Sequence, residues 1–341
     1  MRSDDPQLEA RRLISGFRAY QMMVAACRLE LPDHVATGAK TASELATATG
    51  THEPSLRRML RGLAAWGVLI EGADGRFGST PLSDMFRADR PGLRNMTVML
   101  SGEGYRAWGD LMHTLRTGQP AYPHVFGSTR WEDLANDPAA AAEFNAAMIE
   151  MTARIAAGFI RSYDLSGVRS VVDVGGGNGA LLGAVLKANP AIRGVLFDLP
   201  AGLEGAREKL EKEGVGGRVE IVEGSFFETI PSGADLYLLK SIVHDWDEEH
   251  ARAILETCRR CMGQDARLVL LERTLPERID DSAGTLATVM SDLHMMVVLG
   301  GRERTPAEYG ELLSSAGLRM TRHVAFDAEF GAIEARAVVA G

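Results

Sequence analysis

His244 is the residue whose type and position most directly suggest acid–base chemistry. It follows the apolar run Leu236-Tyr-Leu-Leu-Lys240, which has the composition of a buried strand. An imidazole with an ordinary pKa of about 6.5 can accept a proton from a phenol at neutral pH. The alternative is a histidine whose nitrogens are satisfied within a packed core. The surrounding motif favours a general base.

A glycine-rich turn supplies a second kind of chemistry. The apolar stretch before Asp173-Val-Gly-Gly-Gly-Asn-Gly179 has the character of a strand, and the residues from Ala180 onward have that of a helix. Glycines allow positive φ and let a ligand approach the backbone, whose free amides face it at the helix start. The turn predicts a nucleotide-type ligand. Gly175, Gly177 and Ala180 also fit the dinucleotide fingerprint, so the turn alone leaves the ligand open.

Polar and aromatic residues follow the other predicted strands. Asp198 ends the second strand, and its carboxylate can hold both hydroxyls of a ribose. Glu223-Gly-Ser225-Phe226-Phe227 closes a third strand, and His244-Asp-Trp246 comes shortly after a fourth. Ligands of open α/β sheets bind at the carboxyl ends of the strands, so these ends are expected to converge on one crevice.

The elements that must position these residues indicate an α/β chain with three parts. Alternating strands and helices predict a Rossmann-like, doubly wound sheet flanked by helices over residues 166–341. Residues 101–165 are expected to form a helical linker and a pocket wall. Residues 1–100 are expected to be mainly helical and winged-helix-like, with two helices separated at Gly50 and a short hairpin turning at Asp74-Gly75.

Composition narrows the functional classes. The 341 residues carry a net charge of −9, which argues against general nucleic-acid or anionic-membrane binding. Neither a signal peptide nor a membrane-spanning apolar run is evident, so we expect a cytoplasmic protein. Cys258 and Cys261 have redox or metal spacing but lack a second pair, and we predict no metal site. His113 and His294 are interpreted as ordinary packed or surface residues.

Five motifs together give the chain a family resemblance. They are the glycine turn at 173–179, Phe-Asp-Leu-Pro at 197–200, Gly-Ser-Phe-Phe at 224–227, Leu-Lys-Ser-Ile-Val-His-Asp-Trp at 239–246 and Gly-Gly-Arg-Glu-Arg-Thr at 300–305. In this order the chain resembles the class I S-adenosylmethionine-dependent O-methyltransferases that methylate plant phenolics and bacterial natural products. The resemblance implies S-adenosyl-L-methionine as cofactor, a small-molecule acceptor and a homodimer.

The resemblance also assigns site residues. His244 would be the general base, flanked by Glu272 and Glu303, although Glu303 could instead be a surface charge or cap the helix that begins near Thr305. Ser225 stands where the family usually has an aspartate facing the adenine amino group, which puts donor affinity in doubt. The implied cofactor-binding residues are Asp173, Gly175, Gly177, Asp198, Leu199, Ser225, Phe226, Lys240 and Trp246.

Two further groups of residues follow from the resemblance. The apolar side of the first helix, with Leu13, Phe17, Tyr20 and Val24, has the spacing of a dimer interface. A second group matches substrate-pocket positions, although its helical spacing also suits an ordinary core. Its members are Phe144, Asn145, Met148, Met151, Asp292, Met295 and Met296.

We therefore predict an S-adenosylmethionine-dependent O-methyltransferase acting on a hydroxyl of an aromatic or polyketide-like small molecule. One alternative is a family member that methylates nitrogen, or that binds the donor and catalyses a hydroxylation or rearrangement. A more remote alternative is a DNA-binding regulator that uses Arg57, Arg58 and Arg61 in the winged region.

Overall fold

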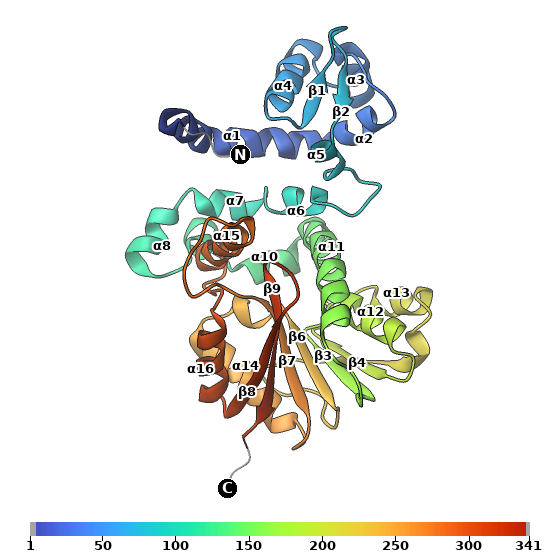
Figure 1. Cartoon of the computed structure of the whole chain (residues 1–341), viewed down its shortest axis with the longest axis vertical. Coiled ribbons are helices and arrows are strands. Elements are labelled where there is room, and N and C mark those ends of the chain that lie inside the picture. Colours follow the sequence, from blue (N-terminus) through green and yellow to red (C-terminus); the bar gives the residue numbers. More distant parts are fainter. Residues whose placement is uncertain (1–4, 339–341) are drawn as a thin grey trace. The chain divides into compact units, whose positions relative to one another are not determined.

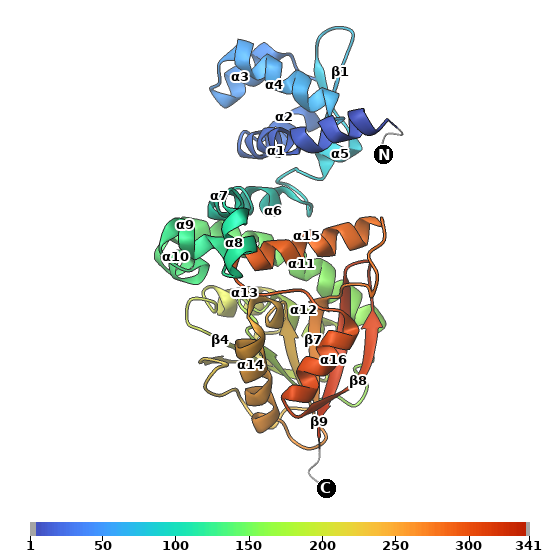
Figure 2. The same ribbon diagram turned by 90° about the vertical axis from the view of Figure 1, so that its left-hand side faces the viewer.

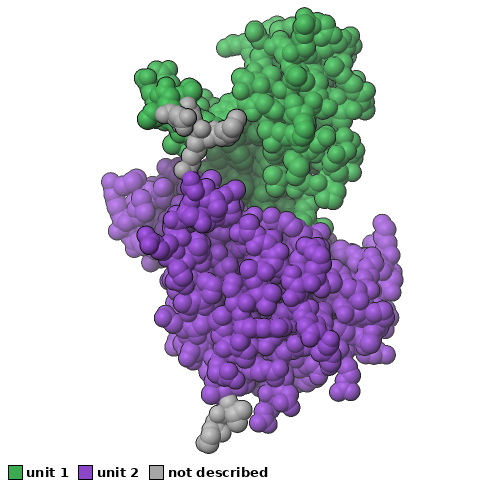
Figure 3. Space-filling model, in the orientation of Figure 1, with its two compact units in different colours: residues 1–105, 137–150 green, residues 106–136, 151–341 purple. Residues whose placement is uncertain are grey.

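The structure, a computed structural model, describes residues 5–338. They fall into two compact units, coloured separately in Figure 3. Unit 1 comprises the residues up to Tyr105 together with Asp137–Glu150, and unit 2 comprises Arg106–Asn136 and the residues from Met151 onward. The segment 101–165 is thus divided between the two units. The predicted three-part division stays a prediction.

Unit 1 is built mainly from helices around one apolar core. Apolar residues of α1 to α4 and of the following hairpin, such as Leu45 and Leu60, are fully buried there. A capping box between Thr41 and Glu44 begins α3, and Gly50 ends it in the left-handed conformation. The helices are α1 (Pro6–Arg28), α2 (Leu31–Ala36), α3 (Ala42–Thr49), α4 (Glu53–Ala65), α5 (Pro81–Asp84), α6 (Arg94–Met99) and the first residues of α7 (Glu103–Trp108).

The predicted hairpin of unit 1 is confirmed. Strands β1 (Leu69–Glu71) and β2 (Phe77–Ser79) pair in antiparallel fashion. Gly75 lies in the turn between them with φ of 74°, a conformation that glycine adopts without strain. The two helices separated at Gly50 are confirmed as well.

Unit 2 contains a seven-stranded sheet with the order β5-β4-β3-β6-β7-β9-β8. The first five strands in this order are parallel, and β9 is antiparallel to both β7 and β8. This arrangement confirms the doubly wound α/β fold (Figure 1). The strands are β3 (Ser170–Val174), β4 (Arg193–Asp198), β5 (Val219–Glu223), β6 (Leu236–Lys240), β7 (Arg267–Arg273), β8 (Leu318–Ala325) and β9 (Phe330–Ala337).

Helices cover both faces of this sheet, so its central strands are apolar on both sides. Val171 of β3 packs in a core with residues of α11 and α12, whereas Val172 packs in a second core with residues of α14 and α16. The covering helices are the second part of α11 (Pro138–Ser162), α12 (Ala180–Ala188), α13 (Ala206–Lys212), α14 (Glu248–Cys261) and α16 (Pro306–Ser315).

A smaller helical layer of unit 2 packs around α15 (Ala283–Val298). Ala121 and Tyr122 are fully buried in a cluster with Val297 and Val298 of α15. Helices α8 and α9 contact α15, and Figure 2 shows them beside it. The helices of this layer are α8 (Leu111–Thr117), α9 (Ala121–Phe126) and α10 (Arg130–Asn136).

Candidate active site

The candidate site lies where the strand order of the sheet reverses. From β3 the chain continues to β4 on one side, and β6 then pairs with β3 on the other. The carboxyl ends of these neighbouring parallel strands therefore meet at one edge, which is where ligands bind in folds of this kind. Asp198 ends β4, Lys240 ends β6 and Glu272 lies near the end of β7.

The glycine turn has the conformation predicted for it. Gly175, Gly177 and Gly179 have φ of 68°, 56° and 78°, where a side chain would be strained. A Cβ atom on Gly175 would also lie 2.6 Å from Cδ1 of Ile242. The turn therefore needs glycine for its conformation, and a side chain at Gly175 would also require Ile242 to move.

Asp198 is fixed by the backbone around it. Its Oδ2 accepts a hydrogen bond from the Gly177 amide, and its Oδ1 accepts one from the Leu199 amide, each at 2.7 Å. Burial raises the pKa of Asp198, while these two amide donors lower it. The carboxylate thus joins the end of β4 to the glycine turn, which places three predicted cofactor-binding residues side by side.

Asp173 and Lys240 lie on the neighbouring strands β3 and β6, and each shifts the pKa of the other. Burial raises the pKa of Asp173 to about 7, although Lys240 opposes the shift. Burial lowers the pKa of Lys240, and the Asp173 carboxylate counteracts this. Within residues 5–338, the Oδ2 atom of Asp173 is buried and has no hydrogen-bond partner. Such an atom, at the start of a binding turn, is suited to a donor from a ligand.

His244 lies in a short 3-10 helix, Val243–Asp245, directly after β6, and is 5% exposed. Its Nδ1–H donates to Oε1 of Glu303 at 2.9 Å, and its Nε2 lies 3.3 Å from Oδ1 of Asp245. Nδ1 is also 3.9 Å from Oε2 of Glu272. The structure therefore brings together the three residues predicted to be catalytic.

The two glutamates hold His244 in different ways. Oε1 of Glu272 accepts hydrogen bonds from the amides of Ile242 and Val243, at 3.1 and 2.9 Å, so this carboxylate positions the turn that carries the histidine. Glu303 instead contacts the imidazole directly. The alternative of Glu303 as a helix cap is wrong, because Thr305 and Glu308 form the capping box of α16.

The electrostatics of this cluster differ from those of an ordinary histidine. Burial alone lowers the pKa of His244, but Glu303, Glu272 and Asp245 raise it to about 10. Burial raises the pKa of Glu272 to about 7 and that of Asp245 to about 6. The expectation of a pKa of about 6.5 for His244 is wrong, because it took no account of these carboxylates. The free site holds an imidazolium paired with Glu303 at neutral pH.

Sequence reasoning missed three residues of this site. Ser291 donates its hydroxyl to Oε1 of Glu303 at 2.7 Å, and Asp245 faces Nε2 of His244. Ser241 has φ of 53°, a strained conformation for a residue other than glycine, immediately after β6. Only Asp245 had a signal in the sequence, its place beside His244. The others depend on contacts between segments far apart in the chain.

Aromatic side chains lie beside the strand ends. The rings of Phe226 and Trp246 are 6.1 Å apart in an edge arrangement, and Phe227 lies 4.8 Å from Trp246. Oγ of Ser225 accepts a hydrogen bond from the Phe227 amide at 3.3 Å. The structure thus groups Ser225, Phe226 and Trp246, as expected for residues that would surround a purine.

The predicted substrate residues divide between the two units. Asp292, Met295 and Met296 lie on α15 in unit 2, and Oδ1 of Asp292 accepts from the Glu303 amide at 2.9 Å. Met151 also belongs to unit 2, where its sulfur lies 3.9 Å from Nη1 of Arg273. The remaining three, Phe144, Asn145 and Met148, belong to unit 1, and their part in a pocket stays a prediction.

The chain is similar to known proteins over almost its whole length. A family model of the O-methyltransferase domain matches residues 108–319, and one of the O-methyltransferase dimerisation domain matches residues 11–89. A phenazine O-methyltransferase of Lysobacter antibioticus is 37% identical over 328 residues, which cover 96% of this chain and 95% of that protein. An aclacinomycin 10-hydroxylase of Streptomyces purpurascens is also 37% identical, over 86% of this chain and 80% of that protein.

A solved structure agrees with these sequence matches. It is an O-methyltransferase from neocarzinostatin biosynthesis, in complex with S-adenosylmethionine and 2-hydroxy-5-methyl naphthoic acid. It superposes on this chain with a TM-score of 0.81 and a sequence identity of 35%, over 94% of this chain and 96% of that one. The chain belongs to the O-methyltransferase family and is an S-adenosylmethionine-dependent enzyme, as its sequence predicted.

Proposed function

We propose that this enzyme methylates a hydroxyl group of an aromatic or polyketide-like small molecule, with His244 as the general base. The observation that supports the base most directly is the 2.9 Å hydrogen bond from Nδ1 of the buried His244 to Glu303. A carboxylate at one imidazole nitrogen fixes the tautomer and stabilises the imidazolium that forms when the other nitrogen accepts a proton.

The strand ends fit S-adenosylmethionine. Oδ2 of Asp173, which has no hydrogen-bond partner within residues 5–338, and the half-buried Lys240 suit the polar amino-acid end of the donor. Asp198 suits its ribose. Phe226 and Trp246 offer apolar surface for the purine. When bound, the donor supplies an electrophilic methyl group on a sulfonium centre. The chain's own task is then to orient the acceptor and to remove its proton.

The pKa of His244 suits a phenolic acceptor. A phenol has a pKa of about 10, close to the value of His244, so proton transfer between them is nearly balanced in energy. Nδ1 donates to Glu303, so Nε2, which faces Asp245, is the nitrogen left to accept the proton. Because the free site holds an imidazolium at neutral pH, His244 acts as the base only after its Nε2–H has passed to solvent. The neutral imidazole then takes the phenolic proton, and the acceptor is held as a phenolate beside the imidazolium that forms.

A second candidate chemistry has one observation in its favour. The aclacinomycin 10-hydroxylase shows that relatives at this level of identity include a protein named for hydroxylation. Methylation of nitrogen is a further alternative within the same fold. Incubation with a methyl-labelled donor and an extract of host metabolites separates methylation from hydroxylation, because only a methylated product carries the label. Fragmentation of the labelled product in a mass spectrometer then shows whether the methyl group is on oxygen or on nitrogen.

The dimerisation domain supports a homodimer. On α1, Leu13 is 74% exposed and Phe17 is 55% exposed, although both are large apolar side chains. Val24, from the same predicted stripe, is instead buried in unit 1, and Tyr20 donates its hydroxyl to the carbonyl oxygen of Thr97. We therefore place the dimer contact on the first half of α1, whose exposed apolar face a second copy would cover.

The remaining predictions concern location and nucleic acid. None of the helices within residues 5–338 combines the length and apolar character needed to cross a bilayer. The cytoplasmic location stays a prediction. So does the absence of nucleic-acid binding, with which two ion pairs agree: Arg57 with Glu53 and Arg61 with Glu71.

Replacing His244 tests the proposed mechanism. His244→Ala is expected to lower kcat by roughly 10² to 10⁴, because the acceptor then loses its proton acceptor. Binding of S-adenosylmethionine, measured by calorimetry, is expected to stay unchanged and serves as the control for folding. Below about pH 10 the loss is expected to stay roughly constant, because the neutral imidazole of the wild type and the free phenolate increase with pH in the same way. A variant that keeps most of its activity at every pH would exclude His244 as the base.

A further inference from the structure

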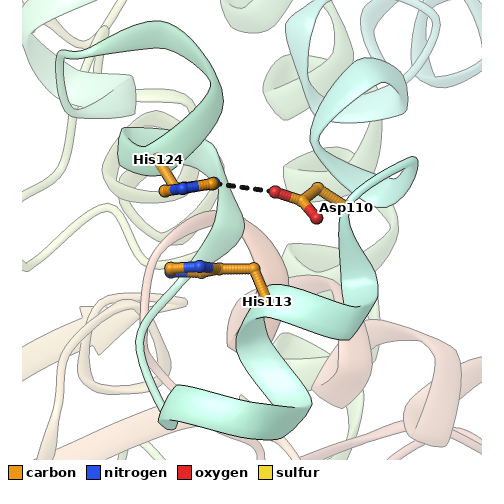
Figure 4. Close-up of side chains that lie close together, drawn as sticks. All are labelled: Asp110, His113 and His124. Carbon is orange, nitrogen blue, oxygen red and sulfur yellow. Dashed lines mark hydrogen bonds and ion pairs between the residues drawn. The ribbon is translucent and has the colours of Figure 1, made fainter.

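Three side chains outside the active site form a compact cluster on α8 and α9 (Figure 4). Asp110 immediately precedes α8, His113 lies in its first turn and His124 lies on α9. Oδ2 of Asp110 is 2.7 Å from Nδ1 of His124, and the two imidazole rings stack with centroids 3.9 Å apart. One ligand atom from each residue lies within 4.8 Å of the other two.

We propose that Asp110, His113 and His124 form a binding site for a divalent transition-metal ion, with Zn²⁺ as the ion that suits it best. Two imidazoles and one carboxylate favour Zn²⁺ over Mg²⁺ and Ca²⁺, because those two ions prefer oxygen ligands. Such a set also leaves at least one tetrahedral position for water.

The geometry requires only side-chain adjustment. Tetrahedral Zn²⁺ with bonds of about 2.1 Å holds its ligand atoms roughly 3.4 Å apart. The imidazole rings of His113 and His124 are stacked nearly parallel, so one ring must turn out of the stack before a nitrogen of each can point at the same ion. The side chain of His124 is 57% exposed and that of Asp110 is 37% exposed, which leaves room for this movement outside the packed core. The ion takes the place of the proton between Nδ1 of His124 and Oδ2 of Asp110, and His124 binds it as a neutral imidazole whose one proton is on Nε2.

The backbone that carries the three ligands is well supported. Asp110 and His113 are three residues apart, and the amide of His113 donates to the carbonyl oxygen of Asp110 at 2.9 Å. Gly118 ends α8 in the left-handed conformation, so that the chain turns back toward α9. Beneath the pair of helices, Ala121 and Tyr122 are fully buried against α15.

A metal ion here would tie α8 to α9 from the outside. These helices contact α15, which carries Ser291 and Asp292, the hydrogen-bond partners of Glu303. The ion would therefore stabilise the layer that supports one wall of the active site. The proposal departs from the expectation of an ordinary His113 and of no metal site, because the sequence alone does not show that His124 lies against His113.

Zinc titration of the full chain, without a histidine tag, tests the proposal. Free Zn²⁺ is measured with a competing chromogenic chelator, for the wild type and for His113→Ala, His124→Ala and Asp110→Asn. His250→Ala is the matched control, because His250 and Asp247 form a similar exposed pair with Nδ1 2.8 Å from Oδ1. Glu303→Gln is a second control, since His244, Glu272 and Glu303 also lie close enough to hold an ion.

The expected result is one Zn²⁺ per chain in the wild type and in both controls. Each of the three cluster variants is expected to bind it at least about tenfold more weakly. Zn²⁺ is also expected to raise the melting temperature of the wild type and of the controls, but not of the cluster variants. Equal affinity in the wild type and the cluster variants would overturn the proposal, as would loss of binding in Glu303→Gln alone. Donor binding by each variant shows that it is folded.

Discussion

The substitution Glu303→Gln tests how the active site sets the pKa of His244. Glutamine has nearly the same shape, and its carbonyl oxygen can still accept the hydrogen bonds from Nδ1 of His244 and from Ser291. The change therefore removes a negative charge while it keeps the imidazole in place. The pKa of His244 is expected to fall, because burial lowers it and the Glu303 carboxylate is the group that raises it most.

The size of the shift follows from the distance. Two unit charges 2.9 Å apart interact by about 6 kcal/mol at an effective dielectric constant of about 20, which corresponds to about four pKa units. The pKa of His244 would then move from about 10 toward about 6. Because Glu272 and Asp245 remain, we expect a fall of at least roughly two units.

Nuclear magnetic resonance gives the most direct measurement. With labelled histidine, eight imidazole signals are expected, and the spectrum of His244→Ala identifies the one from His244. Its titration is compared between the wild type and Glu303→Gln. In activity assays, kcat/KM of the wild type is expected to rise with pH toward about 10 as His244 loses its proton. In the variant, the part of the rise that comes from deprotonation of His244 is expected to end at a lower pH.

Stability provides a second measurement with a defined sign. The pKa of His244 is raised above its ordinary value of 6.5, so its stabilising effect is complete below pH 6.5 and is lost as the pH rises through about 10. The free energy of unfolding should therefore fall less steeply over this range in Glu303→Gln than in the wild type. If His244 of the wild type titrated below pH 7, or if the variant left its pKa unchanged, the electrostatic reasoning would be refuted.

Three further predictions concern other parts of the molecule. Asp173→Asn should stabilise the free enzyme at pH 8 by up to about 4 kcal/mol and have little effect near pH 4. The pKa of Asp173 is raised in the folded protein, so its contribution to stability is fully present below pH 3.8 and is lost as the pH rises through about 7. Chemical unfolding at both pH values checks this. Ser225→Asp should tighten donor binding about tenfold in calorimetry if its side chain faces the purine amino group, and unchanged affinity would place Ser225 elsewhere. Leu13→Glu combined with Phe17→Glu should convert the dimer to a monomer in light scattering, and a dimer that persists would contradict the interface on α1.

Local patterns in the sequence predicted the fold of unit 2 and the glycine turn. The strands of this sheet are apolar on both faces, so they are recognisable as short apolar runs. The glycines needed positive φ, which few other residues adopt, and the structure has it at Gly175, Gly177 and Gly179. Features of this kind depend on neighbouring residues and can be read from the chain itself.

The charge state of the site could not be predicted in the same way. Glu303 lies 59 positions after His244, and only the folded chain places its carboxylate 2.9 Å from the imidazole. The resemblance assigned Glu303 this role, but it gave neither the burial nor the presence of Asp245 and Ser291 around the pair. The pKa depends on all of these contacts together, and for this reason the ordinary value of 6.5 was wrong.

The topology of the sheet separates the two tasks of the site. Asp173 and Asp198, the candidates for holding the donor, belong to β3 and β4, whereas His244 and Glu272 belong to β6 and β7 or follow them directly. The two groups meet only where the strand order reverses. Substitutions of Asp198 should therefore combine additively with substitutions of His244, since Asp198 is held by the amides of Gly177 and Leu199 and His244 by Glu303. Lys240 is the exception, because it interacts with both Asp173 and Glu272, and its replacement should change donor affinity and the pH dependence of catalysis together.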